Sequence, residues 1–211
     1  MSEKRAASPA SFSHDAASLA AIKADLRHRT LTARDQLRAS YRQEQSARLT
    51  EFVDCVGGAS GRVVSGFWPI RSEISPLGLM SALRRRGAQL CLPVVVDKTT
   101  IVFRAFDDEE ALVDAGFGTK GPPSDAAVVD PDIMLIPLSV FDAYGGRIGY
   151  GAGHYDRAIM RLHEKGRSPL KVGIAFGLQE VPQVPQEAHD IPLDLVITPE
   201  GPISPEPLPS P

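Results

Sequence analysis

Five glycines are crowded among charged and aromatic residues between Gly145 and Arg157. An apolar run, residues 133–138, precedes this segment, and a helix-like run, residues 158–162, follows it. A strand, a glycine loop and a helix in this order leave free backbone N–H groups at a helix N-terminus, where they and the helix dipole favour an anion. Glycine also lets the backbone come close to a ligand, because it has no Cβ. The segment therefore indicates a phosphate or nucleotide site.

Charged and aromatic side chains favour this interpretation over a flexible hairpin loop, which needs only the glycines. The loop lacks the Gly-Lys-Ser/Thr of a Walker A motif, and the third glycine of a dinucleotide fingerprint would fall on His154. The side chains that a simple turn would not need are Arg147, Tyr150, His154, Tyr155, Asp156 and Arg157.

Two neighbouring blocks resemble the signature of the 5-formyltetrahydrofolate cyclo-ligase family. Residues 149–157 read Gly-x-Gly-x-Gly-His-Tyr-Asp-Arg, and residues 137–145 before them read Pro-Leu-x-x-Phe-Asp-x-x-Gly. The chain departs from the family pattern at Leu138, where the family has Gly, and at His154, where the family has Tyr. The second departure concerns the way in which the folate ring is held.

Lys23 and Arg27 lie four residues apart within residues 15–56, whose apolar spacing predicts two helices. They therefore share one helix face. A lysine and an arginine together can grip a polyphosphate, although the two residues alone favour an ordinary basic helix surface. The family resemblance changes this balance, because its N-terminal Lys-x-x-x-Arg contacts the phosphates of ATP.

Trp68 and Glu73 follow an apolar run, residues 62–70, that predicts a buried strand, and they precede a helical pattern over residues 77–86. Such a loop lies at the carboxyl end of an open α/β sheet, where ligands bind. Taken alone, Trp68 suits core packing and Glu73 suits a helix start. The resemblance implies that both contact the folate, with Glu73 at its pterin-like ring. A carboxylate can accept hydrogen bonds from the neighbouring amino group and ring N–H of a pterin.

Further apolar runs alternate with helical patterns, which is typical of α/β proteins. The resemblance implies the same class, a three-layer α/β/α fold with a mostly parallel sheet and the N-terminal helices packed alongside. We expect one domain over residues 15–199, a disordered segment at residues 1–14 and an extended proline-rich tail at residues 200–211.

The reaction that the resemblance implies is the ATP-dependent cyclisation of 5-formyltetrahydrofolate to 5,10-methenyltetrahydrofolate, with Mg²⁺ as cofactor. Arg147 is expected to stabilise the transferring phosphoryl group. The expected ATP contacts are Lys23, Arg27, Arg147, Ile148, Gly149, Tyr150, Gly151, Ala152, Gly153, His154 and Tyr155. The expected folate contacts are Trp68, Glu73, Tyr150, Gly151, Ala152, Gly153 and His154.

Asp156 and Asp190 are the expected Mg²⁺ ligands, since this hard cation prefers oxygen. Asp156 belongs to the glycine loop, and Asp190 follows His189 in a His-Asp pair that the family also has. This pair could approach the glycine loop from across the sheet, or it could equally form a turn capped by Asp190.

Composition excludes some partners. The 211-residue chain carries a net charge of −3, which gives no bulk attraction to nucleic acid or to an anionic membrane. No apolar segment approaches membrane-spanning length. Cys55 and Cys91 form no CxxC pair and are expected as reduced thiols in a cytoplasmic protein. We expect a monomer or a weak dimer with ATP and 5-formyltetrahydrofolate as its small-molecule partners.

Two other functions stay open on sequence alone. One is a sugar-phosphate-binding or isomerase-like protein on a similar α/β scaffold, which would bind phosphate without needing ATP. The other is a catalytically silent relative that binds folate or nucleotide, an idea that rests on His154.

Overall fold

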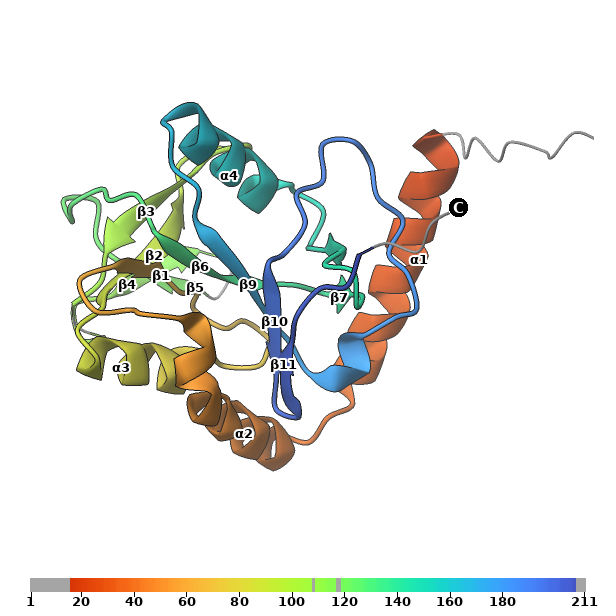
Figure 1. The fold of residues 1–211 in the computed structure, drawn as a ribbon, viewed down its shortest axis with the longest axis horizontal. Helices are drawn as coiled ribbons and strands as arrows, with labels where there is room; N and C mark the ends of the chain where they lie inside the picture. Colours follow the sequence, from red (N-terminus) through yellow and green to blue (C-terminus); the bar gives the residue numbers. More distant parts are fainter. Residues whose placement is uncertain (1–15, 108, 117–118, 208–211) are drawn as a thin grey trace, which may run out of the picture.

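A seven-stranded sheet forms the centre of the protein in a computed structural model (Figure 1), which describes residues 16–107, 109–116 and 119–207. The predicted disorder of residues 1–14 lies outside the described residues. The strand order is β11-β10-β9-β6-β1-β2-β3, and the five inner strands are parallel. The strands are β1 (Val63–Ser65), β2 (Gln89–Val95), β3 (Ile101–Ala105), β6 (Ile133–Pro137), β9 (Leu170–Ile174), β10 (Leu195–Thr198) and β11 (Gly201–Ile203).

Both faces of the sheet are covered by helices, as alternation along β6 requires. Ile133 and Leu135 point to one face and pack with α3 (Leu77–Arg85) and the 3-10 helix η1 (Leu49–Val56). Met134 and Ile136 point to the other face and pack with α4 (His154–Glu164). Most residues of β6, β9 and β10 are therefore buried on both faces of the sheet, which explains their continuous apolar runs. Figure 1 shows α3 and α4 on opposite sides of the sheet, so the predicted three-layer α/β/α fold is confirmed.

The two N-terminal helices lie beside these layers, as predicted. Helix α2 (Ala39–Arg48) packs on η1 and α3. Helix α1 (Ala16–Asp35) stands at the end of the molecule, where it contacts β7 (Val140–Phe141) and η2 (Gly177–Gln179) (Figure 1). Strand β7 pairs with β8 (Arg147–Ile148) in a small hairpin. Helix α1 therefore faces the glycine loop that follows β8.

Two hairpins extend the β1 side of the sheet. Strand β1 pairs with β2 only as far as Cys91, so the remainder of β2 continues with β3 alone. Pro93 lies in this overhanging part, where a missing N–H costs no ladder bond. Strands β4 (Val113–Gly116) and β5 (Thr119–Gly121) form the second hairpin, which contacts β2.

Two predicted boundaries are wrong. The strand expected over residues 62–70 is only Val63–Ser65 long, because the chain leaves the sheet at Gly66 to form a loop. The extended tail expected from residue 200 contains β11, which pairs antiparallel with β10. Pro202 is tolerated there because β11 is an edge strand. Among the described helices, none is both long and apolar enough to cross a membrane.

Candidate active site

The chain changes direction across the sheet between β1 and β6. From β1 it continues to β2 on one side, whereas β6 leads to β9 on the other. A crevice forms outside the carboxyl ends of strands at such a point and is the usual ligand site of an open α/β sheet. A cavity of about 650 Å³ lies there, a size typical of small-molecule sites. The loop after β1 and the glycine loop after β8 both line it.

Hydrogen bonds to the Asp142 carboxylate shape the turn that leads into the glycine loop. This buried carboxylate accepts the backbone N–H groups of Tyr144 (2.9 Å) and Gly146 (2.8 Å) with Oδ1, and that of Val184 (2.7 Å) with Oδ2. Between them Gly145 has φ +85°, and a Cβ there would come within 2.7 Å of the Leu193 carbonyl oxygen. Asp142 and Gly145 thereby fix the start of β8.

The glycine loop ends where α4 begins. Gly153 precedes the first helical residue with φ +62°, and Gly151 has φ +100°. L-residues rarely adopt these conformations, so glycine is needed for the loop to pass closely over the cavity. Asp156 lies in the first turn of α4, where a carboxylate favours the helix dipole.

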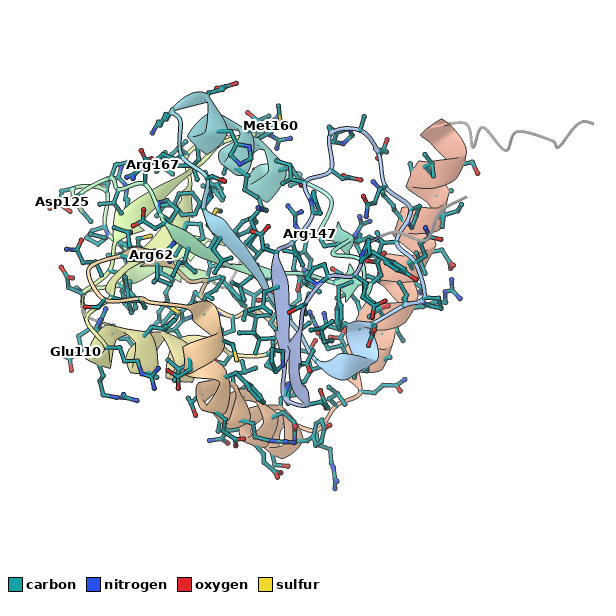
Figure 2. The ribbon with its side chains drawn as sticks, viewed as in Figure 1. Arg62, Glu110, Asp125, Arg147, Met160 and Arg167 are labelled. Carbon is teal, nitrogen blue, oxygen red and sulfur yellow. The ribbon has the colours of Figure 1, made fainter. Side chains whose placement is uncertain are left out.

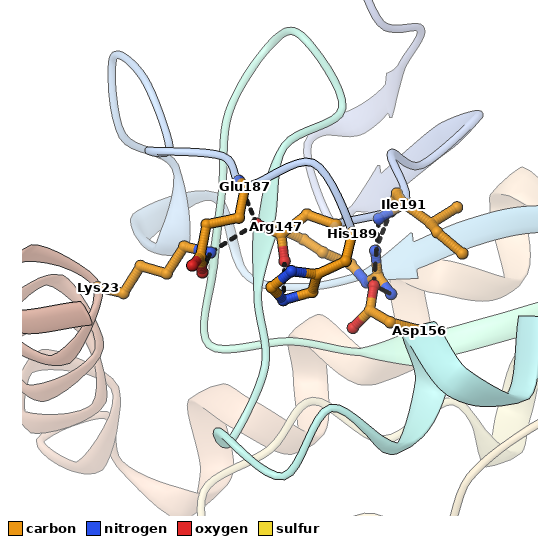
Figure 3. A network of polar contacts seen from close by, with 7 residues as sticks. Lys23, Arg147, Asp156, Glu187, His189 and Ile191 are labelled. Atoms are coloured by element: carbon orange, nitrogen blue, oxygen red, sulfur yellow. Dashed lines mark hydrogen bonds and ion pairs between the residues drawn. The ribbon is translucent and has the colours of Figure 1, made fainter. Parts of the chain in front are cut away.

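Arg147 joins the glycine loop to α4 and to the C-terminal loop, residues 187–191. Its side chain is only 6% exposed and lies inside the molecule (Figure 2). One guanidinium nitrogen is 2.8 Å from Asp156 Oδ1, and another donates to the Ile191 carbonyl. The Ile191 N–H returns a bond of 3.2 Å to Asp156 Oδ1 (Figure 3). Among the described residues, Asp156 Oδ2 has no hydrogen-bond partner.

Lys23 reaches from α1 into the same C-terminal loop (Figure 3). Its Nζ lies 2.8 Å from Glu187 and 2.5 Å from Asp190. Burial alone would lower the pKa of Lys23, but the hydrogen bonds to Asp190 and Glu187 outweigh burial and raise it. Ligand atoms of Glu187, His189 and Asp190 all lie within 4.8 Å of one another. The carboxylates of Glu187 and Asp190 fit a cation that prefers oxygen ligands. Asp156 lines the same cavity.

Arg27 holds the glycine loop from the α1 side. Its Nε donates to the Gly149 carbonyl at 2.8 Å. Its guanidinium carbon would lie 3.7 Å from a Cβ on Gly151. The predicted shared face of Lys23 and Arg27 is therefore confirmed, and that face points into the cavity.

Glu73 lies on the opposite edge of the glycine loop, in the loop after β1. Its Oε1 accepts the Tyr150 hydroxyl at 2.6 Å, and its Oε2 accepts the Ile70 N–H at 2.8 Å. The turn from Ile70 to Glu73 includes Arg71, which alone among the described non-glycine residues has a positive φ, +53°. Burial raises the pKa of the Glu73 carboxyl, against the Tyr150 and Ile70 hydrogen bonds and the positive charges of Arg34 and Arg71.

Trp68 and Lys120 form another part of the wall. The Lys120 Nζ lies 5.6 Å from the centre of the Trp68 ring, which is cation–π distance. Trp68 also lines the cavity, so it does not serve the core alone.

His154 and Arg157 attach α4 to the β2–β3 hairpin. His154 Nε2 is 3.1 Å from the Lys98 carbonyl oxygen, and Arg157 Nε donates to the Thr99 carbonyl at 2.8 Å. The neighbouring Tyr155 hydroxyl is buried, without a hydrogen-bond partner in the described part of the chain. Burial raises the pKa of Tyr155, so this phenol stays protonated.

All the residues predicted to contact ATP, folate or Mg²⁺ line this one cavity, although they come from positions 23 to 190. Sequence reasoning missed several residues that organise it. Arg34 and Glu187 act through tertiary contacts, and Asp142 carries an Asp-x-x-Gly turn signal. The spacing of seven residues from Arg27 was the one sequence signal for Arg34, since two helical turns return to the same face.

A cavity at the switch point of a mostly parallel sheet, edged by a glycine loop that opens a helix, is typical of α/β proteins that bind phosphorylated ligands. Comparison with known proteins gives the family. The sequence pattern of the 5-formyltetrahydrofolate cyclo-ligase family matches residues 20–199. The chain therefore belongs to this family and is an enzyme of the ligase class.

Comparison with individual proteins supports the same family. The chain is 30% identical over 179 residues to 5-formyltetrahydrofolate cyclo-ligase of Escherichia coli K12, an alignment that covers 82% of this chain and 94% of the relative. It is 29% identical over 149 residues to the enzyme of the same name from Mycolicibacterium smegmatis, covering 67% and 75%. The solved structure of Aquifex aeolicus 5,10-methenyltetrahydrofolate synthetase superposes with a TM-score of 0.74 at 26% identity, over 90% of this chain and 95% of that one.

Proposed function

We propose that this chain uses ATP to convert 5-formyltetrahydrofolate into 5,10-methenyltetrahydrofolate, with release of ADP and phosphate. The observation that supports this is the make-up of the cavity. Cationic side chains from α1 and β8, Lys23, Arg27 and Arg147, share it with Trp68 and Glu73 from the loop after β1. A polyanion and a folate ring could thus lie side by side. The family membership and the names of the relatives support the same substrates.

Positioning is the main task of the protein in this reaction. The formyl oxygen attacks the γ-phosphorus of ATP, and ADP leaves. The resulting imidate phosphate carries an activated carbon, which N10 attacks. N10 then loses its proton and inorganic phosphate departs, which leaves the 5,10-methenyl bridge. Each step is intramolecular or occurs between bound substrates, so no protein nucleophile is needed.

Phosphate binding falls to the cationic wall and to the glycine loop. Lys23 and Arg27 face the cavity from α1, and the loop from Arg147 to Tyr155 adds backbone N–H groups. Arg147 is our candidate for stabilising the transferring phosphoryl group, since buried guanidinium groups form strong charge-assisted bonds. Its contact with Asp156 fixes its orientation before substrate arrives.

Folate binding falls to Glu73, Trp68 and residues 150–154. A Glu73 carboxylate can accept the adjacent amino and ring N–H groups of a pterin. The Trp68 ring offers an apolar face, and the Tyr150 hydroxyl already contacts Glu73.

Asp156 and Asp190 would hold Mg²⁺ through carboxylate oxygens. The ion would neutralise phosphate charge when bound. Lys23 forms an ion pair with Asp190 in the structure. When Mg²⁺ binds to this carboxylate, the ammonium group of Lys23 would be free to turn to the phosphates.

Arg147 provides the test of this assignment. We expect Arg147→Ala to lower kcat by roughly 10²- to 10³-fold, the usual cost of removing one donor that stabilises a transition state. Arg147→Lys keeps the charge without the planar fork and should recover only part of the loss. Arg167→Ala, which removes a half-exposed arginine at the periphery (Figure 2), is the control and should leave turnover unchanged. Full turnover by Arg147→Ala would refute the assignment.

A further inference from the structure

Arg34 is a buried cation in the last turn of α1, and its residue surface is only 1% exposed. Within the described residues, no carboxylate lies within ion-pair distance of its guanidinium group. Its hydrogen bonds go to two hydroxyl groups instead, Nε to Ser72 Oγ at 3.0 Å and Nη2 to Tyr150 Oη at 2.8 Å. Burying a guanidinium group without a carboxylate partner costs free energy. We therefore asked what the contacts of Arg34 contribute to the site.

Both hydroxyl groups lead to carboxylates. Tyr150 Oη lies 2.6 Å from Glu73 Oε1, and the Ser72 hydroxyl donates to Asp35. The Arg34 guanidinium also lies 5.9 Å from the centre of the Tyr150 ring. Arg34 thus connects α1 to both loops that line the folate side of the cavity, and Tyr150 separates its positive charge from Glu73.

The chemistry of the groups sets the direction of this chain of hydrogen bonds. A guanidinium group can only donate, so the Tyr150 oxygen must accept from Arg34. Burial and the nearby Glu73 carboxylate raise the pKa of Tyr150, which therefore keeps its single proton. That proton can point only to Glu73, and Oε1 must accept it. The arrangement selects a Glu73 that is an acceptor on both oxygens.

We propose that Arg34 is a positioning residue: through the Tyr150 hydroxyl it holds Glu73 in place as an ionised acceptor for the folate ring. This inference rests on the proposed function, because it gives Glu73 a folate to bind. Arg34 itself is not expected to touch either substrate, since it lies behind Tyr150 and does not line the cavity.

Several groups face Glu73 and balance its charge. Burial raises the pKa of Glu73, whereas the hydrogen bonds from Tyr150 and Ile70 and the charges of Arg34 and Arg71 lower it. From α4, the uncharged phenol of Tyr155 is also near enough to interact with it. Without the positive charge of Arg34, less opposes the effect of burial, so Glu73 would take up a proton at a higher pH. A protonated carboxyl group donates from one oxygen and can no longer accept both pterin donors.

Binding of 5-formyltetrahydrofolate without ATP tests this directly, read from the fluorescence of Trp68, the only tryptophan in the chain. Affinity would be measured at a series of pH values from neutral downwards, because a raised pKa of Glu73 moves the fall in affinity to a higher pH. We expect Arg34→Met to weaken folate binding at neutral pH by roughly 10- to 100-fold, the usual range for a lost bond to a charged group. We also expect the fall in affinity at low pH to begin at a higher pH than in the wild type.

Matched variants separate this role from a purely structural one. Arg34→Lys keeps a cation and should shift the low-pH fall less than Arg34→Met. Arg29→Met removes an exposed arginine of the same helix, and it should behave as the wild type. ATP affinity, measured in parallel, should stay the same in all of them. If Arg34→Met does not fold, Tyr150→Phe removes only the bridging hydroxyl from a partly exposed ring and should shift the low-pH fall in the same direction.

The outcomes are distinct. A wild-type protein that binds no folate would overturn the proposed function and this inference together. Wild-type folate binding, with an unmoved low-pH fall in both Arg34→Met and Tyr150→Phe, would overturn the inference alone. Loss of affinity for ATP as well as folate in Arg34→Met would also contradict it, because that result would indicate a structural role.

Discussion

Single charged side chains in this site are held by partners that differ in kind. Arg147 is tied to a carboxylate and a carbonyl, Lys23 to two carboxylates, and Arg34 to two hydroxyl groups. The first two contact carboxylates directly. Arg34 reaches a carboxylate only through the Tyr150 hydroxyl, which bonds to Glu73 on the side of the cavity where we propose that folate binds.

The pH dependence of folate binding should follow Glu73. Its pKa is raised by burial, so the carboxylate protonates above the pH at which an ordinary glutamate does. Folate affinity should therefore be full at neutral pH and should fall as the pH decreases through that raised pKa. Glu73→Gln should bind folate roughly 10- to 100-fold more weakly at neutral pH, and the pH-dependent step should disappear.

Binding titrations of 5-formyltetrahydrofolate at a series of pH values measure this. Glu44→Gln, on an exposed position of α2, is the control and should keep the wild-type profile. A Glu73→Gln profile identical to that of the wild type would assign the titration to another group.

The residues that line the ligand site could be predicted from the sequence, whereas their hydrogen-bond and ion-pair partners could not. Lys23, Arg27, Glu73 and Arg147 were expected around one ligand site, and they line one cavity. The link between Lys23 and Asp190 joins residues 167 positions apart, so no local pattern reveals it. The same holds for Arg34, whose partners lie on two other segments.

The glycine loop acts as an element whose shape depends on backbone conformation. Gly145 starts it with φ +85° in close contact with the backbone of Leu193, whereas Gly149 has an ordinary φ and open space around its Cβ position. Substitution by alanine should therefore destabilise the protein at Gly145 but not at Gly149.

Gly145→Ala should lower stability by about 2 kcal/mol or more, from the strain of a positive φ together with the backbone clash. For a domain of this size, that corresponds to a fall in Tm of roughly 4–8 °C. Thermal unfolding followed by circular dichroism measures it. Gly149→Ala is the matched control for stability, and its Tm should stay within about 1 °C of the wild type. Equal Tm values for the two variants would show that loop conformation does not limit stability.

Helices and inner strands follow from periodicity, but the ends of the sheet do not. The apolar run at residues 62–70 reads as one strand, yet its second half leaves the sheet to carry Trp68 towards the cavity. Strand β11 was missed because prolines dominate its region. Composition argues against strands in general, whereas an edge position makes proline acceptable.

On the scale of the whole molecule, the site needs both ends of the domain. Helix α1 supplies Lys23, and the loop before β10 supplies Asp190. Strand β11 covers the edge of β10, and the Glu206 N–H then bonds to the Ala143 carbonyl at 2.9 Å, next to the turn of the glycine loop. The segment after residue 199 thus supports the loop.

A chain that ends at Thr198 should accordingly be less stable. It loses the β10–β11 hydrogen bonds and the packing of Ile203 on the core, together about 2–3 kcal/mol. Tm should fall by roughly 4–12 °C. A chain that ends at Pro207 keeps β11 and is the control. The prediction fails if both shortened chains melt at the same temperature.

In the proposed reaction, ATP and 5-formyltetrahydrofolate bind in the same cavity and the γ-phosphoryl group passes to the formyl oxygen. The most direct measurement mixes the purified protein with MgATP and 5-formyltetrahydrofolate and follows the near-ultraviolet absorbance of the methenyl product, with ATP omitted in the control. We predict that the product forms only when ATP is present, and that ADP and phosphate appear in equal amounts. Folate binding without product or phosphate release would contradict the proposed reaction and would identify a silent relative. His154→Tyr would then show whether this one departure from the family pattern is the cause.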